Sequence, residues 1–200
     1  MCNLYRLSSP ADAIRALFKA TGADAPNLPE HARIFPDQAA PVVICEGSER
    51  RLVRMLWGVP PPAGVARPIT NVRNLASPFW RGLLASPRQR ALVPVSAFCE
   101  WSAAADPATG RKRQHWFAVR EAPLFAFAGV WRSGAGDAPP RFAFLTCAPN
   151  ALVGAVHPKA MPVILAGDAA DRWLNGDPAA GFQQPFADDR MVELPHDAAP

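Results

Sequence analysis

Short apolar segments recur along the chain, and each one soon ends at proline, glycine or a cluster of polar residues. The clearest segments lie at residues 41–45, 51–57, 91–95, 98–101, 116–120, 124–131 and 142–146. Runs of this length that are rich in valine, phenylalanine and tryptophan favour β-strands over helices. The polar spacer at residues 46–50 predicts a hairpin between the first two segments. A chain with this pattern is expected to build its core from many short strands.

Helical patterns are fewer and shorter. Residues 10–20 predict a helix, because apolar side chains follow the i, i+3, i+4 spacing and a proline suits the first turn. Shorter helices are predicted at residues 150–156 and 168–174, and residues 176–200 are expected to form a loosely packed tail. We therefore predict one α+β domain over residues 1–200, in which a mixed or antiparallel β-rich core carries a few short helices.

Length and composition limit the class of protein. The chain has 200 residues, which suits one domain, and its hydrophobic fraction of 50% with 19% charged residues predicts a packed core. The sequence contains no apolar run of the roughly 18 residues that a membrane span needs. The N-terminus also lacks the basic and apolar regions of a signal peptide. We expect a soluble cytoplasmic protein without a membrane partner, with a monomer as the default.

The cysteines give no sign of a metal site or a disulfide framework. The four of them, at positions 2, 45, 99 and 147, are widely spaced. They form no C-x-x-C pair, and no histidine lies at zinc-ligand spacing from them. A chain of this length can also build a core without disulfides.

The charge permits a nucleic-acid partner. The formal net charge is +4, and lysine occurs only at positions 19, 112 and 159, so most of the 21 basic residues are arginine. The planar guanidinium group binds phosphate and stacks on bases. A GC-rich genome that favours arginine codons explains the same excess equally well.

Cys2 is the most distinctive candidate for chemistry. Methionine is commonly removed before a small second residue, which would leave Cys2 with a free α-amine of pKa about 7.7–8.0 beside a thiol of about 8.5. An aldehyde can form a Schiff base with such an amine, after which the sulfur closes a five-membered thiazolidine ring. No internal cysteine can do this, because its nitrogen is part of an amide. The alternative is a small residue tolerated at a frayed terminus.

Two further polar residues lie in apolar surroundings. Glu100 is embedded in the least polar setting of any carboxylate in the chain, which favours a raised pKa and general acid–base work. It could equally be an edge-strand residue paired with a surface arginine. His157 precedes an apolar segment at residues 163–165 and is a candidate proton shuttle or a loop residue.

Nucleic-acid contacts are predicted between residues 70 and 81. Strand periodicity would place Asn71 and Arg73 on one face. Trp80 and Arg81 then offer an aromatic plane beside a guanidinium group that can bind phosphate.

Taken in chain order, these pieces resemble the SRAP family (SOS response-associated peptidase), whose members shield abasic sites by DNA–protein crosslinking. The matching blocks are Met1-Cys2, Trp57-Gly58, Asn71-x-Arg73, Leu92-Val-Pro94 leading to Glu100-Trp101, Phe127-Ala-Gly-Val-Trp131, and His157 followed by Met161-Pro-Val-Ile-Leu165. Together they span about residues 2–174. The resemblance implies a β-rich α+β fold with a barrel-like core, and no metal or organic cofactor.

The resemblance also implies roles for individual residues. Cys2 would form the thiazolidine with an abasic site in single-stranded DNA. Asn71 would hold the new N-terminus, Glu100 would shuttle protons, and His157 would assist opening of the sugar ring. The family's backbone-gripping positions match Arg73 and Arg81.

The chain departs from the family pattern at several places. The usual Met-Cys-Gly-Arg start has Asn3 and Leu4 here, and Val-Pro-Pro-Pro at residues 59–62 replaces a loop that carries further tryptophans. If those tryptophans stack on bases, Trp80 is the candidate to replace them. The histidine block has one extra residue, so that Lys159 is nearest the missing arginine.

Two other functions remain open from the sequence. A cysteine peptidase or hydrolase could use Cys2, His157 and Glu100 as a triad, and self-removal of Met1 would be a peptidase-like event. A non-covalent single-stranded nucleic-acid-binding module would use the arginines and tryptophans without any chemistry.

Overall fold

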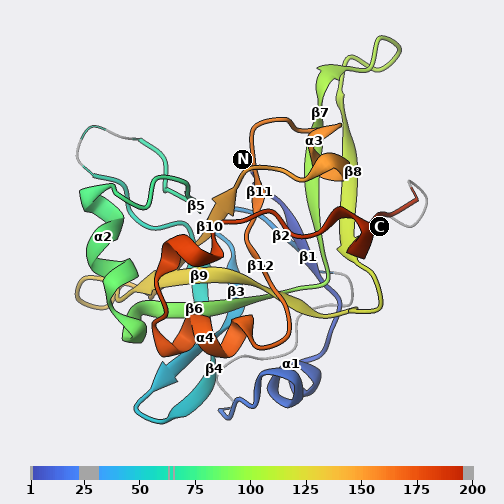
Figure 1. Ribbon diagram of the computed structural model, residues 1–200. Helices are drawn as coiled ribbons and strands as arrows, with labels where there is room; N and C mark the ends of the chain where they lie inside the picture. Colours follow the sequence, from blue (N-terminus) through green and yellow to red (C-terminus); the bar gives the residue numbers. More distant parts are fainter. Residues whose placement is uncertain (1, 23–31, 63, 65, 196–200) are drawn as a thin grey trace.

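Two sheets form the framework of the protein (Figure 1). The computed structural model describes residues 2–22, 32–62, 64 and 66–195. The first sheet has five strands, and each of its pairings is antiparallel. Their spatial order is β13 (Met191–Glu193), β8 (Lys112–Val119), β7 (Ala97–Ala105), β1 (Tyr5–Leu7) and β2 (Ala32–Ile34).

The second sheet curves round the core. Its spatial order is β11 (Met161–Pro162), β10 (Arg141–Cys147), β4 (Glu49–Trp57), β3 (Ala39–Glu46), β6 (Arg90–Val95), β9 (Phe125–Arg132) and β12 (Ile164–Leu165), with β5 (Asn71–Val72) paired to β10. Strand β10 pairs with β9 on one side and makes a short parallel contact with β4 on the other. The sheet is therefore mixed and barrel-like rather than a strictly closed barrel. The predicted α+β class with a β-rich core is confirmed.

The helices are short and lie around the sheets (Figure 1). The described residues contain α1 (Ala11–Phe18), α2 (Pro78–Ala85), α3 (Ala151–Gly154) and α4 (Ala169–Asn175), together with the 3-10 helices η1 (Pro87–Gln89), η2 (Ala179–Phe182) and η3 (Asp188–Arg190). The three predicted helices correspond to α1, α3 and α4. Helix α2 was not predicted, although Pro78 stands in its first turn and Leu83 and Leu84 bury its apolar side. Within the described ranges, no helix is long and apolar enough to cross a membrane.

The prediction of a loosely packed tail is wrong for residues 176–195. Strand β13 pairs with β8, and Met191 is buried. The Asn150 side chain also donates a hydrogen bond to the Phe186 carbonyl at 2.8 Å. Backbone groups of this segment form hydrogen bonds by joining the edge of a sheet. Such a long-range pairing is not indicated by a Pro- and Asp-rich composition. Residues 196–200 lie outside the described part of the chain.

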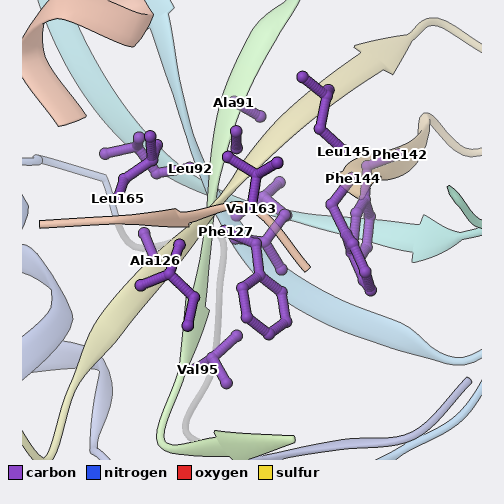
Figure 2. Packing of buried hydrophobic residues seen from close by; sticks show 14 of the residues in the cluster. Ala91, Leu92, Val95, Ala126, Phe127, Phe142, Phe144, Leu145, Val163 and Leu165 are labelled. Atoms are coloured by element: carbon purple, nitrogen blue, oxygen red, sulfur yellow. The ribbon is translucent and has the colours of Figure 1, made fainter. Parts of the chain in front are cut away.

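Aromatic side chains fill the space between the sheets. Tyr5 packs edge-on against Trp57, with ring centroids 5.2 Å apart, and Trp57 stacks on Phe144 at 5.2 Å. The ring centroids of Phe127 and Phe144 are 4.8 Å apart, and Figure 2 shows both rings with Val163 in the buried cluster. Tyr5 follows Cys2 by only three positions, so this packing anchors the N-terminal segment to the core.

Candidate functional site

Asn71 ties the N-terminal segment to the second sheet. Its side-chain amide nitrogen donates hydrogen bonds to the Cys2 carbonyl at 2.9 Å and to the Thr70 hydroxyl at 2.7 Å. The indole of Trp57 donates in turn to the Thr70 carbonyl at 3.2 Å, so a core residue fixes the start of β5. Asn71 is buried, and its Oδ1 atom has no hydrogen-bond partner within the described ranges. That oxygen can therefore accept one further donor.

Cys2 lies beside β7 because the N-terminal segment continues along that strand. Strand β1 pairs antiparallel with β7, and the Cys99 amide donates to the Leu4 carbonyl at 2.9 Å. The Cys2 thiol is within hydrogen-bonding range of the Leu4 carbonyl at 3.4 Å and of the Cys99 carbonyl at 3.8 Å. The direction of the pairing brings Cys2 next to Glu100, the residue that follows Cys99.

Burial dominates the electrostatics of the Cys2 thiol. The residue is 1% exposed, and this burial raises the pKa of the thiol well above its ordinary value. The negative charge of Glu100 raises the pKa further. With the whole chain in place, the thiol is therefore protonated at neutral pH, and its proton is the one that any reaction at the sulfur must move.

Glu100 is a buried carboxyl group that can exchange that proton. It is 1% exposed, and burial raises its pKa from 4.5 to about 7. Its Oε1 atom is buried without a hydrogen-bond partner in the described part of the chain, while Oε2 lies 3.9 Å from Nδ1 of His157. A carboxyl group with a pKa near 7 is populated in both protonation states at neutral pH, which suits general acid–base catalysis.

His157 reaches the site from the segment that follows α3. The side chain of Asn150 caps that helix by accepting from the Val153 amide at 2.9 Å, and the His157 amide donates to the Val153 carbonyl at 2.8 Å. Burial lowers the pKa of the His157 imidazole, and the positive charges of Lys159 and Lys112 lower it as well. The ring is therefore mainly neutral near pH 7, so one nitrogen can donate a proton and the other can accept one.

A pocket of about 380 Å³ opens over these groups. It is lined by Asn3, Glu100, Trp101, Lys112 and His157. The Trp101 indole donates to the Asn3 side-chain oxygen at 3.1 Å, which closes one wall of the pocket. The pocket therefore presents a proton-exchanging carboxyl group and a neutral imidazole, and the buried Cys2 thiol, on which the charge of Glu100 acts, is the nucleophile of the same site.

Sequence reasoning missed Asn3, Trp101 and Lys112 as pocket residues. The first two are immediate neighbours of Cys2 and Glu100, so adjacency could have indicated them. Lys112 reaches the pocket only because β8 pairs back along β7, with Ala105 opposite Lys112 after a bulge. No local sequence signal contains that register.

The predicted DNA-contact residues differ in exposure. Arg73, Arg81 and Lys159 are exposed, as phosphate contact requires. Trp80, by contrast, is 5% exposed, and its ring packs edge-on against Phe79 with centroids 4.6 Å apart. The prediction that Trp80 offers a plane to a base does not fit this burial, because α2 turns the ring inward as part of its apolar side.

The described residues are 2–22, 32–62, 64 and 66–195. In those ranges no three histidine, cysteine, aspartate or glutamate residues lie close enough together to hold an ion. The four cysteines are present as free thiols.

Comparison with known proteins places the chain in a family. The sequence pattern of the family described as SOS response associated peptidase (SRAP) matches residues 1–195. The chain belongs to the SRAP family. Among curated SRAP relatives, the abasic site processing protein YoqW of Bacillus subtilis is 30% identical over 190 residues, covering 88% of this chain and 80% of the relative. The abasic site processing protein YobE of the same organism is 30% identical over 190 residues, covering 88% and 82%.

Solved structures share the fold of this SRAP chain. A crystal structure of a protein from Bacteroides thetaiotaomicron superposes with a TM-score of 0.77 at 20% identity, covering 98% of this chain and 93% of the other. One from Bordetella bronchiseptica gives a TM-score of 0.76 at 22% identity, covering 97% and 100%.

Proposed function

We propose that this protein binds single-stranded DNA at abasic sites and bonds covalently to them through Cys2, which shields the lesion during the response to DNA damage. The observation that carries the proposal is the buried Glu100 carboxyl, with its pKa of about 7, whose charge acts on the Cys2 thiol. The names of the curated relatives support the substrate, since they are abasic site processing proteins. The protein would act in the bacterial cytoplasm as a monomer, on the nucleoid when bound to DNA.

The reaction begins once Met1, which lies outside the described residues, has been removed. The free amine of Cys2 adds to the aldehyde carbon of the ring-opened deoxyribose, and loss of one water gives an imine. The thiol sulfur then adds to the imine carbon and its proton is transferred to the nitrogen, which closes a thiazolidine ring. The net change is the loss of one water molecule, and no oxidant, metal or organic cofactor takes part.

Each neighbour of Cys2 has a distinct task in this reaction. Asn71 holds the Cys2 carbonyl and so orients the amine on the same residue. Glu100 takes protons from the amine and the thiol and returns them to the departing water and the ring nitrogen. His157, neutral near pH 7, moves the proton of the sugar hydroxyl when the ring opens. The exposed cations Arg73, Arg81 and Lys159 hold the phosphate backbone.

General proteolysis is less consistent with the site. A cysteine peptidase needs a thiolate, usually stabilised by an adjacent imidazolium group. Here burial raises the pKa of the Cys2 thiol, and the hydrogen-bond acceptors of that thiol are the carbonyls of Leu4 and Cys99. Self-removal of Met1 would be a single hydrolysis at the bond preceding Cys2, for which Glu100 is the adjacent acid–base group.

A denaturing gel with abasic single-stranded DNA tests the proposal. Protein whose intact mass shows the loss of Met1 should give a shifted band that survives denaturation, with a mass equal to protein plus DNA minus one water. The band should be absent for Cys2→Ala. If the processed wild-type protein gives only a salt-sensitive complex that dissociates on denaturation, the covalent mechanism is wrong and the binding-module alternative holds.

The variant Cys2→Ser tests the order of the two bonds. It keeps the α-amine but lacks the thiol, so borohydride should trap its Schiff base, whereas no stable band should form without the reductant. A variant with a retained residue before Cys2 keeps the thiol but lacks the amine, and it should give no band under either condition. A stable band from that blocked variant would contradict the role of the amine.

A further inference from the structure

The strands that carry Glu100 and Lys112 continue beyond the pocket as a projecting hairpin. Strands β7 and β8 pair from Phe98 opposite Phe117 to Ala105 opposite Lys112. Beyond Trp101 the register shifts through a bulge, and Figure 1 shows the end of this hairpin extending away from the two sheets. We call residues 102–113 the basic arm. A long excursion of this kind contributes nothing to the core, since its side chains from 103 to 113 are exposed.

The tip of the basic arm is held by a dense set of hydrogen bonds. The Asp106 amide donates to the Arg111 carbonyl at 2.8 Å, and the Gly110 amide donates to the Asp106 carbonyl at 2.8 Å. The Asp106 carboxylate accepts from the amides of Ala108 at 2.8 Å and Thr109 at 3.2 Å. Further down the hairpin, the Arg113 amide donates to the Ser102 hydroxyl at 3.0 Å. The arm is therefore pre-organised, which lowers the entropy cost of binding.

The charges of the basic arm are nearly all of one sign. Arg111, Lys112 and Arg113 are consecutive and exposed, whereas Asp106 is the one acidic residue of the arm. The Asp106 carboxylate is engaged by backbone amides of the turn. Lys112 also lines the pocket with Glu100 and His157. Positive charge therefore extends continuously from the pocket onto the arm.

We propose that the basic arm binds the phosphates of the DNA strand that flanks the abasic site on one side, and this rests on the proposed function. Arginine and lysine side chains on an ordered hairpin suit phosphate oxygens. Residues 102–113 include no aromatic side chain on which a base could stack, so the contact is to the backbone and independent of sequence.

The reach of the arm sets the length of the contact. Strand residues rise about 3.4 Å each, and the four positions of β7 from Trp101 to Ala105 oppose only the two of β8 from Gln114 to Lys112, so the paired part of the arm advances roughly 7 Å beyond Trp101 before its turn begins. The contact is therefore limited to the few phosphates nearest the lesion. Only one flank can follow the arm, because the arm leaves the pocket in one direction.

The test is non-covalent binding by fluorescence anisotropy at several salt concentrations. The probe is single-stranded DNA with a central tetrahydrofuran analogue, which has no aldehyde and cannot crosslink. The arm variant is Arg111→Ser with Arg113→Ser, and the matched control is Arg54→Ser with Arg88→Ser, which removes the same charge from exposed positions on β4 and η1. Lys112 is left in place because it belongs to the pocket.

The arm variant should lower the slope of log K against log salt by about 1.4, which is two single-strand phosphate contacts, while the control leaves it unchanged. Replacing the two arginines by lysines should restore most of the slope. Removing the flank on one side of the lesion should abolish the difference between arm variant and wild type, and removing the other flank should not. The arm proposal is overturned if the arm variant and the control have equal salt slopes, or if the wild type does not bind the probe. It is also overturned if the difference in slope between arm variant and wild type persists on both shortened probes.

Crosslinking of the wild type to true abasic DNA separates this proposal from the proposed function. If the wild type crosslinks but the arm variant binds like the control, the arm proposal alone fails. If the arm variant loses slope on one flank but the wild type never crosslinks, the arm contact stands and the covalent mechanism fails. If replacing the arm arginines leaves every DNA measurement unchanged, the arm proposal is refuted and the arm is indicated to bind a partner other than DNA.

Discussion

Replacing Glu100 by glutamine removes a carboxylate whose ionisation the fold opposes. Burial raises the pKa of this group from 4.5 to about 7, a change of about 2.5 units. Each unit corresponds to about 1.36 kcal/mol, so the ionised carboxylate lowers the free energy of unfolding by about 3 kcal/mol. Below about pH 4 the carboxyl is protonated in both states and the penalty disappears. Between about pH 4 and pH 7 this carboxyl is ionised in the unfolded chain but still largely protonated in the folded protein, so the free energy of unfolding falls as the pH rises.

The measurable quantity is the pH dependence of the difference between Glu100→Gln and wild type. Urea unfolding at several pH values from about 4 to about 8 gives the free energy of unfolding for both proteins. As the pH rises across this range, the free energy of unfolding of the variant should increase by about 3 kcal/mol relative to that of the wild type. Any fixed cost of placing the glutamine amide beside an unpartnered site is the same at every pH and cancels. Other titrating groups that keep their pKa also cancel, because both proteins contain them.

His157 is the group that could distort this result, since its ring lies 3.9 Å from the carboxylate. The same comparison in a His157→Gln background removes that coupling. The Cys2 thiol, with its raised pKa, stays neutral throughout the range. A difference that remains constant within about 0.5 kcal/mol in both backgrounds would refute the reasoning, because a carboxylate with an ordinary pKa gives no such slope. In the same pH range Glu100→Gln should slow crosslinking and remove its dependence on a group with a pKa near 7.

Three further outcomes are expected. Asn71→Ala removes the 2.9 Å hydrogen bond to the Cys2 carbonyl and should slow crosslinking about tenfold in single-turnover gels; an unchanged rate would show that the amine needs no such orientation. Gly129→Ala would place a Cβ atom 2.9 Å from Cγ2 of Val93, so urea titration should show a loss of about 1–3 kcal/mol, and an unaltered midpoint would contradict this packing. Arg73→Ala should lower the salt slope of single-stranded DNA binding by about 0.7, measured by anisotropy, and an identical slope would exclude a phosphate contact there.

The strand pattern could be predicted because it depends on local chemistry. The hairpin predicted from residues 41–45 and 51–57 is β3 and β4, and the segments predicted at 116–120, 124–131 and 142–146 overlap β8, β9 and β10. Runs of β-branched and aromatic residues between turn formers carry that information in the sequence itself. The strand Met191–Glu193 was missed, because three residues are too few to show a strand pattern and this strand forms through its pairing with β8.

The convergence of Cys2, Asn71, Glu100 and His157 was implied by the family resemblance rather than by local pattern. These residues are separated by tens of positions. The pairing of β1 with β7 and the bond from Asn71 to the Cys2 carbonyl bring the first three together, and the segment after α3 adds His157, whose Nδ1 atom lies 3.9 Å from Glu100. Trp80 shows the opposite case. An aromatic residue beside an arginine suggested a stacking surface, but which side of a short helix faces the core is a tertiary property that adjacency cannot supply.

The burial of Cys2 also decides which of its two nucleophiles starts the proposed reaction. A thiol with a raised pKa remains protonated near pH 7 and is a poor initial nucleophile. The α-amine released by loss of Met1 is the other nucleophile of this residue, and a carboxylate with a pKa near 7 in the same site can accept its proton. The amine therefore attacks first, and the thiol reacts only when the imine carbon is already within reach and Glu100 is again free to take a proton. A peptidase would need the reverse order, with a thiolate formed before any bond to substrate, and the environment that suits ring closure opposes that state.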